Sequence, residues 1–415
     1  MQTRLLERFL RYTAVTSQSD ASQTVVPSTE GQRRLAELLK KDLTELGLVD
    51  LEISEYSVLT GKLPANLPGG SSGQIPAVGF VAHLDTVDVK LAADIRPQVV
   101  RAYSGGDVCL NAKEGIYLRE AEHPELLQYK GQDIVFSDGT SVLGADNKAA
   151  VANIVVALET LTQNKTLLHG DIYVAFVPDE ECGLRGAKKM DLSKFPVAFA
   201  YTIDCCELGE VVYETFNAGS AVIKIKGVSA HPMSAKGVMV NPLLAAIDFA
   251  NLFDRQQTPE CTDGKEGYIW VKGMQGNQST ATVNLDIRDH DKIKYEARKQ
   301  TVWENVEKIQ KLYPKAVINC DINDTYGNIA DAVNDENRKC IDYIYTAMSE
   351  LGIKPKTIAM RGGTDGSYIS TQGILTPNYF TGGHNFHSNC EFLPLPSLEK
   401  SCLMTLKLIE LIAKG

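Results

Sequence analysis

Apolar and polar residues follow one another along this chain in patterns that predict an α/β protein. Two amphipathic helices are expected near the start, over 3–12 and 29–46. Residues 50–56 alternate between polar and apolar side chains as a strand does, and further strands are expected over 75–82, 173–177, 197–203, 356–360 and 376–380. A further helix follows residue 146, because apolar residues between 151 and 161 recur on one helical face. The chain therefore predicts a sheet with helices packed against it.

Between residues 215 and 330 the pattern changes. The expected strands and helices follow the order β-α-β-β-α-β, over 220–226, 241–253, 267–274, 280–288, 296–312 and 316–321. This is the ferredoxin-like arrangement. We expect 215–330 to be an inserted α+β lid or dimerisation domain, and 1–214 with 331–415 to form one catalytic domain around a central mixed sheet.

Two stretches are less regular. Residues 61–73 are rich in Pro, Gly and Ser, which predicts a surface loop. Residues 87–133 are assigned to peripheral hairpins or to the border of an active site.

Ionisable side chains stand at the ends of the predicted strands. His83, Glu180, Glu181, Asp204 and His387 each follow an apolar run, and Asp146 begins a helix. In an open α/β sheet, ligands bind at the carboxyl ends of the strands. Taken singly, each residue has an ordinary explanation, such as a helix cap for Asp146 or a solvated turn for the acids at 179–181. Their joint occurrence favours a functional site.

The residue types indicate a metal centre. Two histidines and three carboxylates suit a pair of zinc ions, and one carboxylate can bridge them. Cobalt or manganese could replace zinc, whereas calcium would not select two histidines. Asp85 lies two residues after His83, so both side chains point the same way from an extended backbone and the carboxylate can orient the imidazole.

Composition narrows the choice of partners and compartment. The 415 residues are 44% hydrophobic and 23% charged, which is ordinary for a globular protein. A net charge of -10 argues against nucleic acid and anionic membranes as partners. No apolar stretch is long enough for a membrane helix, so we expect a cytoplasmic protein. The nine cysteines are an odd number without metal-knuckle spacing, which indicates reduced thiols.

The quoted residues resemble the peptidase T family of tripeptide aminopeptidases, within the two-zinc co-catalytic exopeptidases and deacylases. The resemblance covers nearly the whole chain. It is carried by HLDT, LGADNKAAVA, VPDEECG, FAYTID, AHPMSAKGVMVNPL, IRDHD, RGGTDG and FTGGHNFHSNCEF.

This resemblance implies a role for each matching position. The implied zinc ligands are His83, Asp146, Glu181, Asp204 and His387, with Asp146 bridging. Asp85 is implied to orient His83 and Glu180 to act as general base, with a cis peptide after Asp146. The residues implied to lie near the substrate are His231, Arg288 and Arg361.

Three positions depart from the family pattern. Asn147 stands where an acid is expected beside the bridging residue, Cys205 and Cys206 replace small residues, and Ser388–Asn389–Cys390 alters the segment after the last histidine. None of these changes removes an implied ligand.

The expected reaction is the release of the N-terminal residue of a short peptide by a zinc-bridged water, with Glu180 moving the proton. His231 is a candidate for oxyanion stabilisation, within its own chain or across a homodimer, and Arg288 and Arg361 for gripping a terminal carboxylate. Two alternatives remain open. One is a related dipeptidase, carboxypeptidase or N-acyl amino acid deacylase, and the other is a binding protein without activity, against which the intact Glu180 argues.

Overall fold

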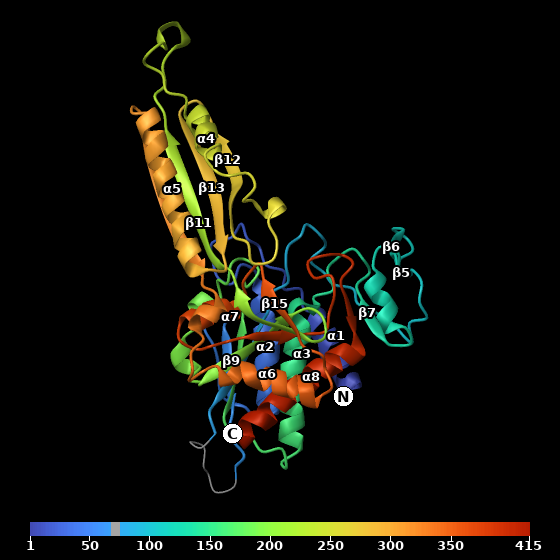
Figure 1. The fold of residues 1–415 in the computed structure, drawn as a ribbon. Helices are drawn as coiled ribbons and strands as arrows, with labels where there is room; N and C mark the ends of the chain where they lie inside the picture. The colour runs from blue at the N-terminus through green and yellow to red at the C-terminus, as the bar shows by residue number, and fades with distance from the viewer. Residues whose placement is uncertain (68–74) are drawn as a thin grey trace. The chain divides into compact units, whose positions relative to one another are not determined.

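The computed structural model describes residues 1–67 and 75–415 (Figure 1). The chain divides into two compact units. The first comprises Met1–Tyr213, Val333–Ile358 and Thr364–Gly415, and the second comprises Glu214–Ala332 and Ala359–Gly363.

An eight-stranded sheet forms the centre of the first unit. Its strand order is β1-β2-β8-β3-β9-β16-β10-β15. In this order the bounds are Val49–Ile53, Leu59–Leu63, Ile172–Val177, Val78–His83, Phe199–Cys205, Asn378–Phe380, Glu210–Thr215 and Lys356–Met360. β8, β3, β9 and β16 run parallel, whereas β1, β2 and β10 pair antiparallel with their neighbours. The predicted α/β class with a central mixed sheet is confirmed.

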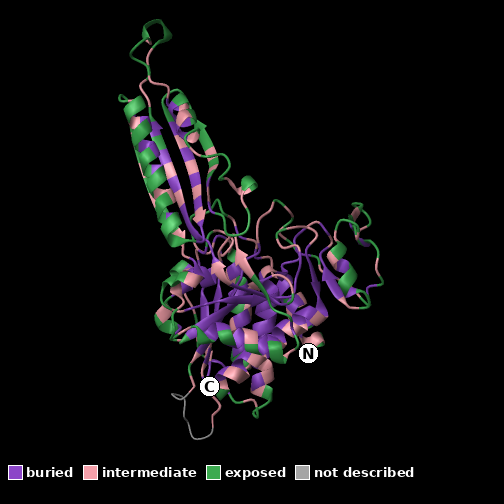
Figure 2. Cartoon of the chain, viewed as in Figure 1, coloured by how far each residue is buried: buried purple, intermediate pink, exposed green. Residues whose placement is uncertain are grey.

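Among the described residues, six α-helices belong to the first unit. They are α1 (Gln2–Thr13), α2 (Glu30–Glu45), α3 (Ala145–Gln163), α6 (Lys339–Glu350), α7 (Asp365–Thr371) and α8 (Leu395–Lys414). α3 packs against β3 and β9, and also against α1 and α8. Every residue from 147 to 158 is buried, as the purple centre of this unit in Figure 2 illustrates. The helix is therefore enclosed on all sides rather than on the single face that its periodicity suggested.

Residues 87–133 and their surroundings form small sheets. β4 (Gln98–Val100), β7 (Ile134–Phe136) and β17 (Phe392–Pro394) make a three-stranded sheet, and β5 (Val108–Asn111) pairs with β6 (Ile116–Leu118) as a hairpin. The predicted hairpin is confirmed. Because β17 pairs with β7, the segment that precedes β17 is anchored close to the chain that leads into α3.

The second unit contains a four-stranded antiparallel sheet in the order β12-β13-β11-β14. Its elements along the chain are β11 (Asn217–Lys226), α4 (Pro242–Ala250), β12 (Tyr268–Gly276), β13 (Thr280–Asp289), α5 (Lys292–Leu312) and β14 (Val317–Tyr326). This is the predicted β-α-β-β-α-β order. Both helices pack against β11 and β13, and the residues of β13 alternate between a buried and a more exposed face (Figure 2).

Several predicted boundaries are wrong. Residues 61–63 belong to β2 and not to a loop, because they pair with β8, and residues 68–73 of that predicted loop lie outside the described residues. The helix predicted over 241–253 ends at Ala250. Asp204 is the penultimate residue of β9 and does not follow its end. None of the described helices combines the length and the apolar character that a membrane crossing requires.

Candidate metal centre

Six ionisable side chains meet at the carboxyl ends of the parallel strands. His83 is the last residue of β3, Glu180 and Glu181 follow β8, and Asp204 lies at the end of β9. Asp146 lies in the first turn of α3, and His387 lies in the segment between β16 and β17. Since β8, β3 and β9 are parallel neighbours, their register brings the first four residues to one edge of the sheet.

The carboxylate of Asp146 lies between the two histidines. Its Oδ1 is 2.8 Å from Nε2 of His83, and its Oδ2 is 3.0 Å from Nε2 of His387. His83 is 2% exposed, whereas the side chain of His387 is 46% exposed. Each oxygen of one carboxylate thus faces a different imidazole, as a ligand that bridges two metal ions would.

In the part of the chain that the structure describes, three groups of side chains have ligand atoms that all lie within 4.8 Å of one another. The groups are His83–Glu180–Glu181, His83–Asp146–Asp204 and Asp146–Glu181–His387. The last two share Asp146. All five ligands predicted from the sequence are therefore brought together, with Glu180 beside them.

One contact tests whether these residues fit a metal ion. Oε1 of Glu181 is buried and lies 2.9 Å from Nε2 of His387, yet it makes no hydrogen bond among the described residues. The two atoms therefore approach each other without the alignment of a hydrogen bond, as two ligands of one ion do. Imidazole nitrogens with carboxylate oxygens are a donor set typical of zinc, so the residues fit divalent cations.

The electrostatics of the centre point the same way. Burial, followed by the charge of Asp146, raises the pKa of Glu181 to about 7. Burial is also the main cause that raises the pKa of Glu180 and of Asp204 well above the usual range. Burial alone would lower the pKa of His387, but its contacts with Asp146 and Glu181 raise it to about 11. This buried excess of carboxylates is unfavourable unless cations balance it.

Asp85 is fully buried and holds two parts of the centre together. Nδ1 of His83 is hydrogen-bonded to the backbone oxygen of Asp85 at 3.0 Å and lies 3.3 Å from its Oδ1. The carboxylate also accepts the backbone N–H groups of Glu180 and Glu181, at 3.1 and 3.2 Å. These contacts place the proton of His83 on Nδ1 and leave Nε2 available as a ligand.

The helix-cap interpretation of Asp146 is wrong. Gly144 occupies the N-cap position of α3, and Asp146 itself has non-helical backbone angles, with φ -84° and ψ 99°. A cis peptide joins Asp146 to Asn147, as the resemblance implied. The contacts of its carboxylate are with the two histidines and not with the free N–H groups of the helix.

The first acid of the Asp-Glu-Glu cluster has a structural role. Asp179 is fully buried and accepts hydrogen bonds from the backbone N–H of Ser28 at 2.7 Å and from Nε2 of Gln32 at 2.7 Å. It therefore anchors the start of α2 to the turn that carries Glu180 and Glu181.

Sequence reasoning did not assign a role to Glu391. This carboxylate is 2% exposed and accepts three backbone N–H groups, from Leu143 at 2.6 Å, Gly144 at 3.0 Å and Asp146 at 3.1 Å. The sequence feature that could have indicated this role is the position of Glu391. It is an acid directly before the apolar residues of β17 and four residues after His387.

All nine cysteines are free thiols. Three of them, Cys182, Cys205 and Cys206, adjoin the centre in sequence. Burial raises the pKa of each, so the thiol form is favoured at neutral pH. This does not support a thiolate role.

The residues expected near the substrate all belong to the second unit. Arg361 donates to the backbone oxygens of Gly264 and Glu266 and to Oγ1 of Thr262. Arg288 donates to the backbone oxygens of Gly219 and Ile287. His231 is exposed, and its Nδ1 accepts the backbone N–H of Met233 at 3.2 Å.

Both arginines are neighbours of Tyr268. The guanidinium of Arg361 is 5.5 Å from the ring centre of Tyr268, and Tyr268 is the cross-strand partner of Arg288. The structure thus brings Arg288 and Arg361 into the same region of the second unit.

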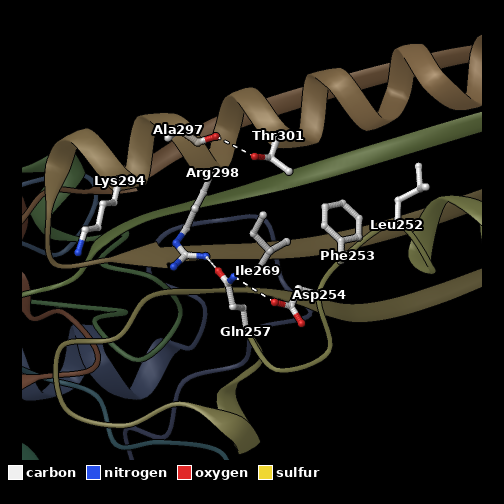
Figure 3. A pocket seen from close by; sticks show the side chains of 9 residues that line it. All are labelled: Leu252, Phe253, Asp254, Gln257, Ile269, Lys294, Ala297, Arg298 and Thr301. Carbon is white, nitrogen blue, oxygen red and sulfur yellow. Dashed lines mark hydrogen bonds between the residues drawn. The ribbon is translucent and has the colours of Figure 1, made fainter.

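A separate cavity of about 360 Å³ lies within the second unit, between α5 and the chain that follows α4 (Figure 3). Arg298 lines it, but its charge is already balanced by Asp289 at 2.8 Å and its Nη1 donates to Gln257. None of the lining residues belongs to the metal-ligating groups, so this cavity is not the candidate centre.

The family model described as peptidase family M20/M25/M40 matches residues 144–411. The chain belongs to this family and is therefore a hydrolase that acts on peptide bonds.

Individual relatives refine this assignment. A Yersinia pestis protein named as peptidase T-like is 54% identical over 405 residues, which cover 98% of this chain and 97% of the relative. A protein of Caldanaerobacter subterraneus subsp. tengcongensis named peptidase T is 40% identical over 412 residues, 99% of each chain.

Solved structures share the fold. The aminopeptidase PepT of Bacillus cereus has a TM-score of 0.77 at 22% identity, over 100% of this chain and 99% of its own. A Bacillus subtilis protein described as a dinuclear metal binding peptidase of the M20 family has a TM-score of 0.64 at 14% identity, over 100% and 98%. The family thus includes dinuclear metal-binding proteins.

Proposed function

We propose that the protein is a metal-dependent aminopeptidase that releases the N-terminal residue of tripeptides. The observation that supports this most is the carboxylate of Asp146, whose two oxygens face His83 and His387 separately. Full-length relatives named peptidase T support the substrate class.

We assign the ligands to two zinc ions per subunit. His83, Asp146 and Asp204 hold one ion, and Asp146, Glu181 and His387 hold the other. Cobalt or manganese can substitute, since the donor set suits either. When bound, the ions polarise the peptide carbonyl and lower the pKa of water toward neutrality.

Glu180 is the general base in this proposal. It lies within 4.8 Å of both His83 and Glu181 and is not needed to complete either proposed metal position. It takes a proton from the attacking water and returns it to the leaving amine. Asp85 positions Glu180 through the backbone N–H that its carboxylate accepts.

The second unit, which comprises the predicted domain 215–330 and also residues 359–363, serves as a lid with the substrate-binding groups. Arg288 and Arg361 hold the terminal carboxylate of the peptide, because a guanidinium can form two parallel hydrogen bonds with it. His231 stabilises the oxyanion, a contribution typically worth ~3 kcal/mol.

Two further assignments accompany the proposal. The nine free thiols fit a reducing cytoplasm. A homodimer would cover apolar side chains of the second unit such as Leu244 and Ile247, which are 54% and 44% exposed. Light scattering of the purified protein tests the second assignment.

The decisive experiment compares an unblocked tripeptide, a dipeptide and an N-acetylated tripeptide as substrates. The apo protein is reconstituted with zinc or cobalt and tested beside Glu180→Ala. We expect cleavage of the tripeptide from its amino end, and loss of activity in the variant with both ions retained. Faster turnover of the dipeptide or the blocked peptide would instead identify a sister enzyme of the family.

A further inference from the structure

The side chain of Asn147 contacts one of the two proposed metal positions and not the other. Its Nδ2 donates to Oδ1 of Asp204 at 2.9 Å and to the backbone oxygen of Ile203 at 2.8 Å. Its Oδ1 accepts the backbone N–H of His83 at 3.3 Å. None of these bonds reaches Glu181 or His387.

The amide of Asn147 suits this place because its N–H groups meet acceptors and its oxygen meets a donor. Asn147 is completely buried. Its two N–H groups face two acceptors, and its oxygen faces a donor. An apolar residue of similar size would leave the backbone N–H of His83 and an oxygen of Asp204 without these partners in a buried region, which is unfavourable.

Asn147 also joins three separate elements. It follows Asp146 directly in α3, and its hydrogen bonds reach the last residue of β3 and the end of β9. These are the elements that supply His83, Asp146 and Asp204, the whole of one ligand group. Glu391 accepts the backbone N–H of Asp146, which both groups share, and Glu181 of the other group lies in the turn after β8.

We propose that Asn147 is a positioning residue that sets the metal affinity of the His83–Asp146–Asp204 position independently of the Asp146–Glu181–His387 position. The inference rests on the proposed dinuclear centre. Asn147 keeps the carboxylate of Asp204 turned toward His83 before the metal ion binds. Metal binding therefore does not have to fix the orientation of this carboxylate. Loss of such an outer contact lowers metal affinity by about 10- to 100-fold.

The test titrates the apo protein with Co²⁺ and measures binding by the visible absorption of the bound ion. It is done in two variants, each of which keeps one metal position. His387→Ala leaves only the first position complete, and Asp204→Ala leaves only the second. We expect Asn147→Leu to weaken binding about 10- to 100-fold in the His387→Ala background. In the Asp204→Ala background, we expect a change of no more than about twofold, since the hydrogen bonds of Asn147 reach His83, Ile203 and Asp204 and not Glu181 or His387.

Asn153→Leu is the matched control. Asn153 is a fully buried asparagine of the same helix, and its side chain is hydrogen-bonded to Ser401 and Thr405. Its loss should lower the stability of the fold without changing Co²⁺ affinity in either background. If Asn147→Leu does not fold, Asn147→Ala replaces it, because the smaller alanine side chain does not clash with the neighbouring atoms.

The outcomes separate this inference from the proposed function. Equal losses in both backgrounds, or no loss in the His387→Ala background, would overturn the role of Asn147 while the wild type still binds two ions and cleaves peptides. A wild-type protein that binds no Co²⁺ would overturn both.

Discussion

The carboxylate of Glu391 accepts the backbone N–H of Asp146 at 3.1 Å, across 245 residues of sequence. The same carboxylate accepts two further N–H groups of the turn that leads into α3, from Leu143 and Gly144. Glu391 lies four residues after His387, so it ties the segment that carries this histidine to the turn that carries Asp146. The distance between the two proposed ligands, Asp146 and His387, therefore depends on the buried side chain of Glu391.

Glu391→Gln should weaken the metal centre. The amide would turn an N–H group toward backbone donors, and an unpaired buried donor costs about 1–3 kcal/mol. We expect the free energy of unfolding to fall by that amount and zinc affinity to fall about 10- to 100-fold. Chemical denaturation and metal titration measure the two effects. Glu399→Gln is the control, since Glu399 lies on α8 and accepts a hydrogen bond from Gln2 of α1. Unchanged zinc affinity in Glu391→Gln would contradict the assigned role.

Asp179→Asn should affect stability and not the metal. The carboxylate of Asp179 accepts N–H groups from Ser28 and Gln32. The amide of an asparagine would turn its own N–H group toward one of these N–H groups, and that hydrogen bond would be lost. We expect a loss of about 1–3 kcal/mol in the free energy of unfolding, with two metal ions still bound. Elemental analysis of the folded variant checks the metal content. Glu181→Gln gives the contrast, because it should lose metal with a smaller effect on stability.

Arg361→Ala should raise the KM for tripeptides. A charge-assisted hydrogen bond contributes about 1.5–3 kcal/mol, which corresponds to roughly 10- to 100-fold in KM. The matched control is a tripeptide with an amidated carboxyl end, for which the wild type and the variant should have similar KM values. If the substitution affected both substrates equally, Arg361 would act by anchoring residues 262–266 and not as a carboxylate clamp.

The pH dependence of stability should include a contribution from His169. This residue is 3% exposed, and burial lowers its pKa. The charge of Lys165 also lowers the pKa, whereas the hydrogen bond to the backbone oxygen of Gly170 and the charge of Asp171 raise it. The unfolded chain therefore takes up a proton at a higher pH than the folded one does. Stability should be unaffected by this group above its unfolded pKa of about 6.5 and should fall as the pH decreases below that value.

Thermal denaturation at pH 7.5 and 5.5 measures this effect. We expect His169→Gln to lose less stability than the wild type between these two values. An equal loss in both proteins would show that His169 is not the group responsible.

The positions of the strands were predictable because the pattern that specifies them is local. An apolar run followed at once by His83, or by Glu180 and Glu181, identifies both a buried strand and the polar group at its end. Where the prediction was wrong, a partner distant in sequence decided the outcome. Residues 61–63 became a strand because they pair with β8, which no feature of their own composition indicates.

By itself, the sequence determined the α/β class, the ferredoxin-like order of the second unit and the set of residues proposed to form the metal centre. These features depend on hydrophobic periodicity and on residue type, which can be recognised within short segments. Only the tertiary structure decided that Asp179 bonds to the start of α2, and that Glu391 and Asn147 bond to the segments that carry the proposed ligands. Their hydrogen bonds span 147, 245 and 57 residues, and a bond of that kind is defined by how the elements pack and not by the neighbours of a residue in the chain.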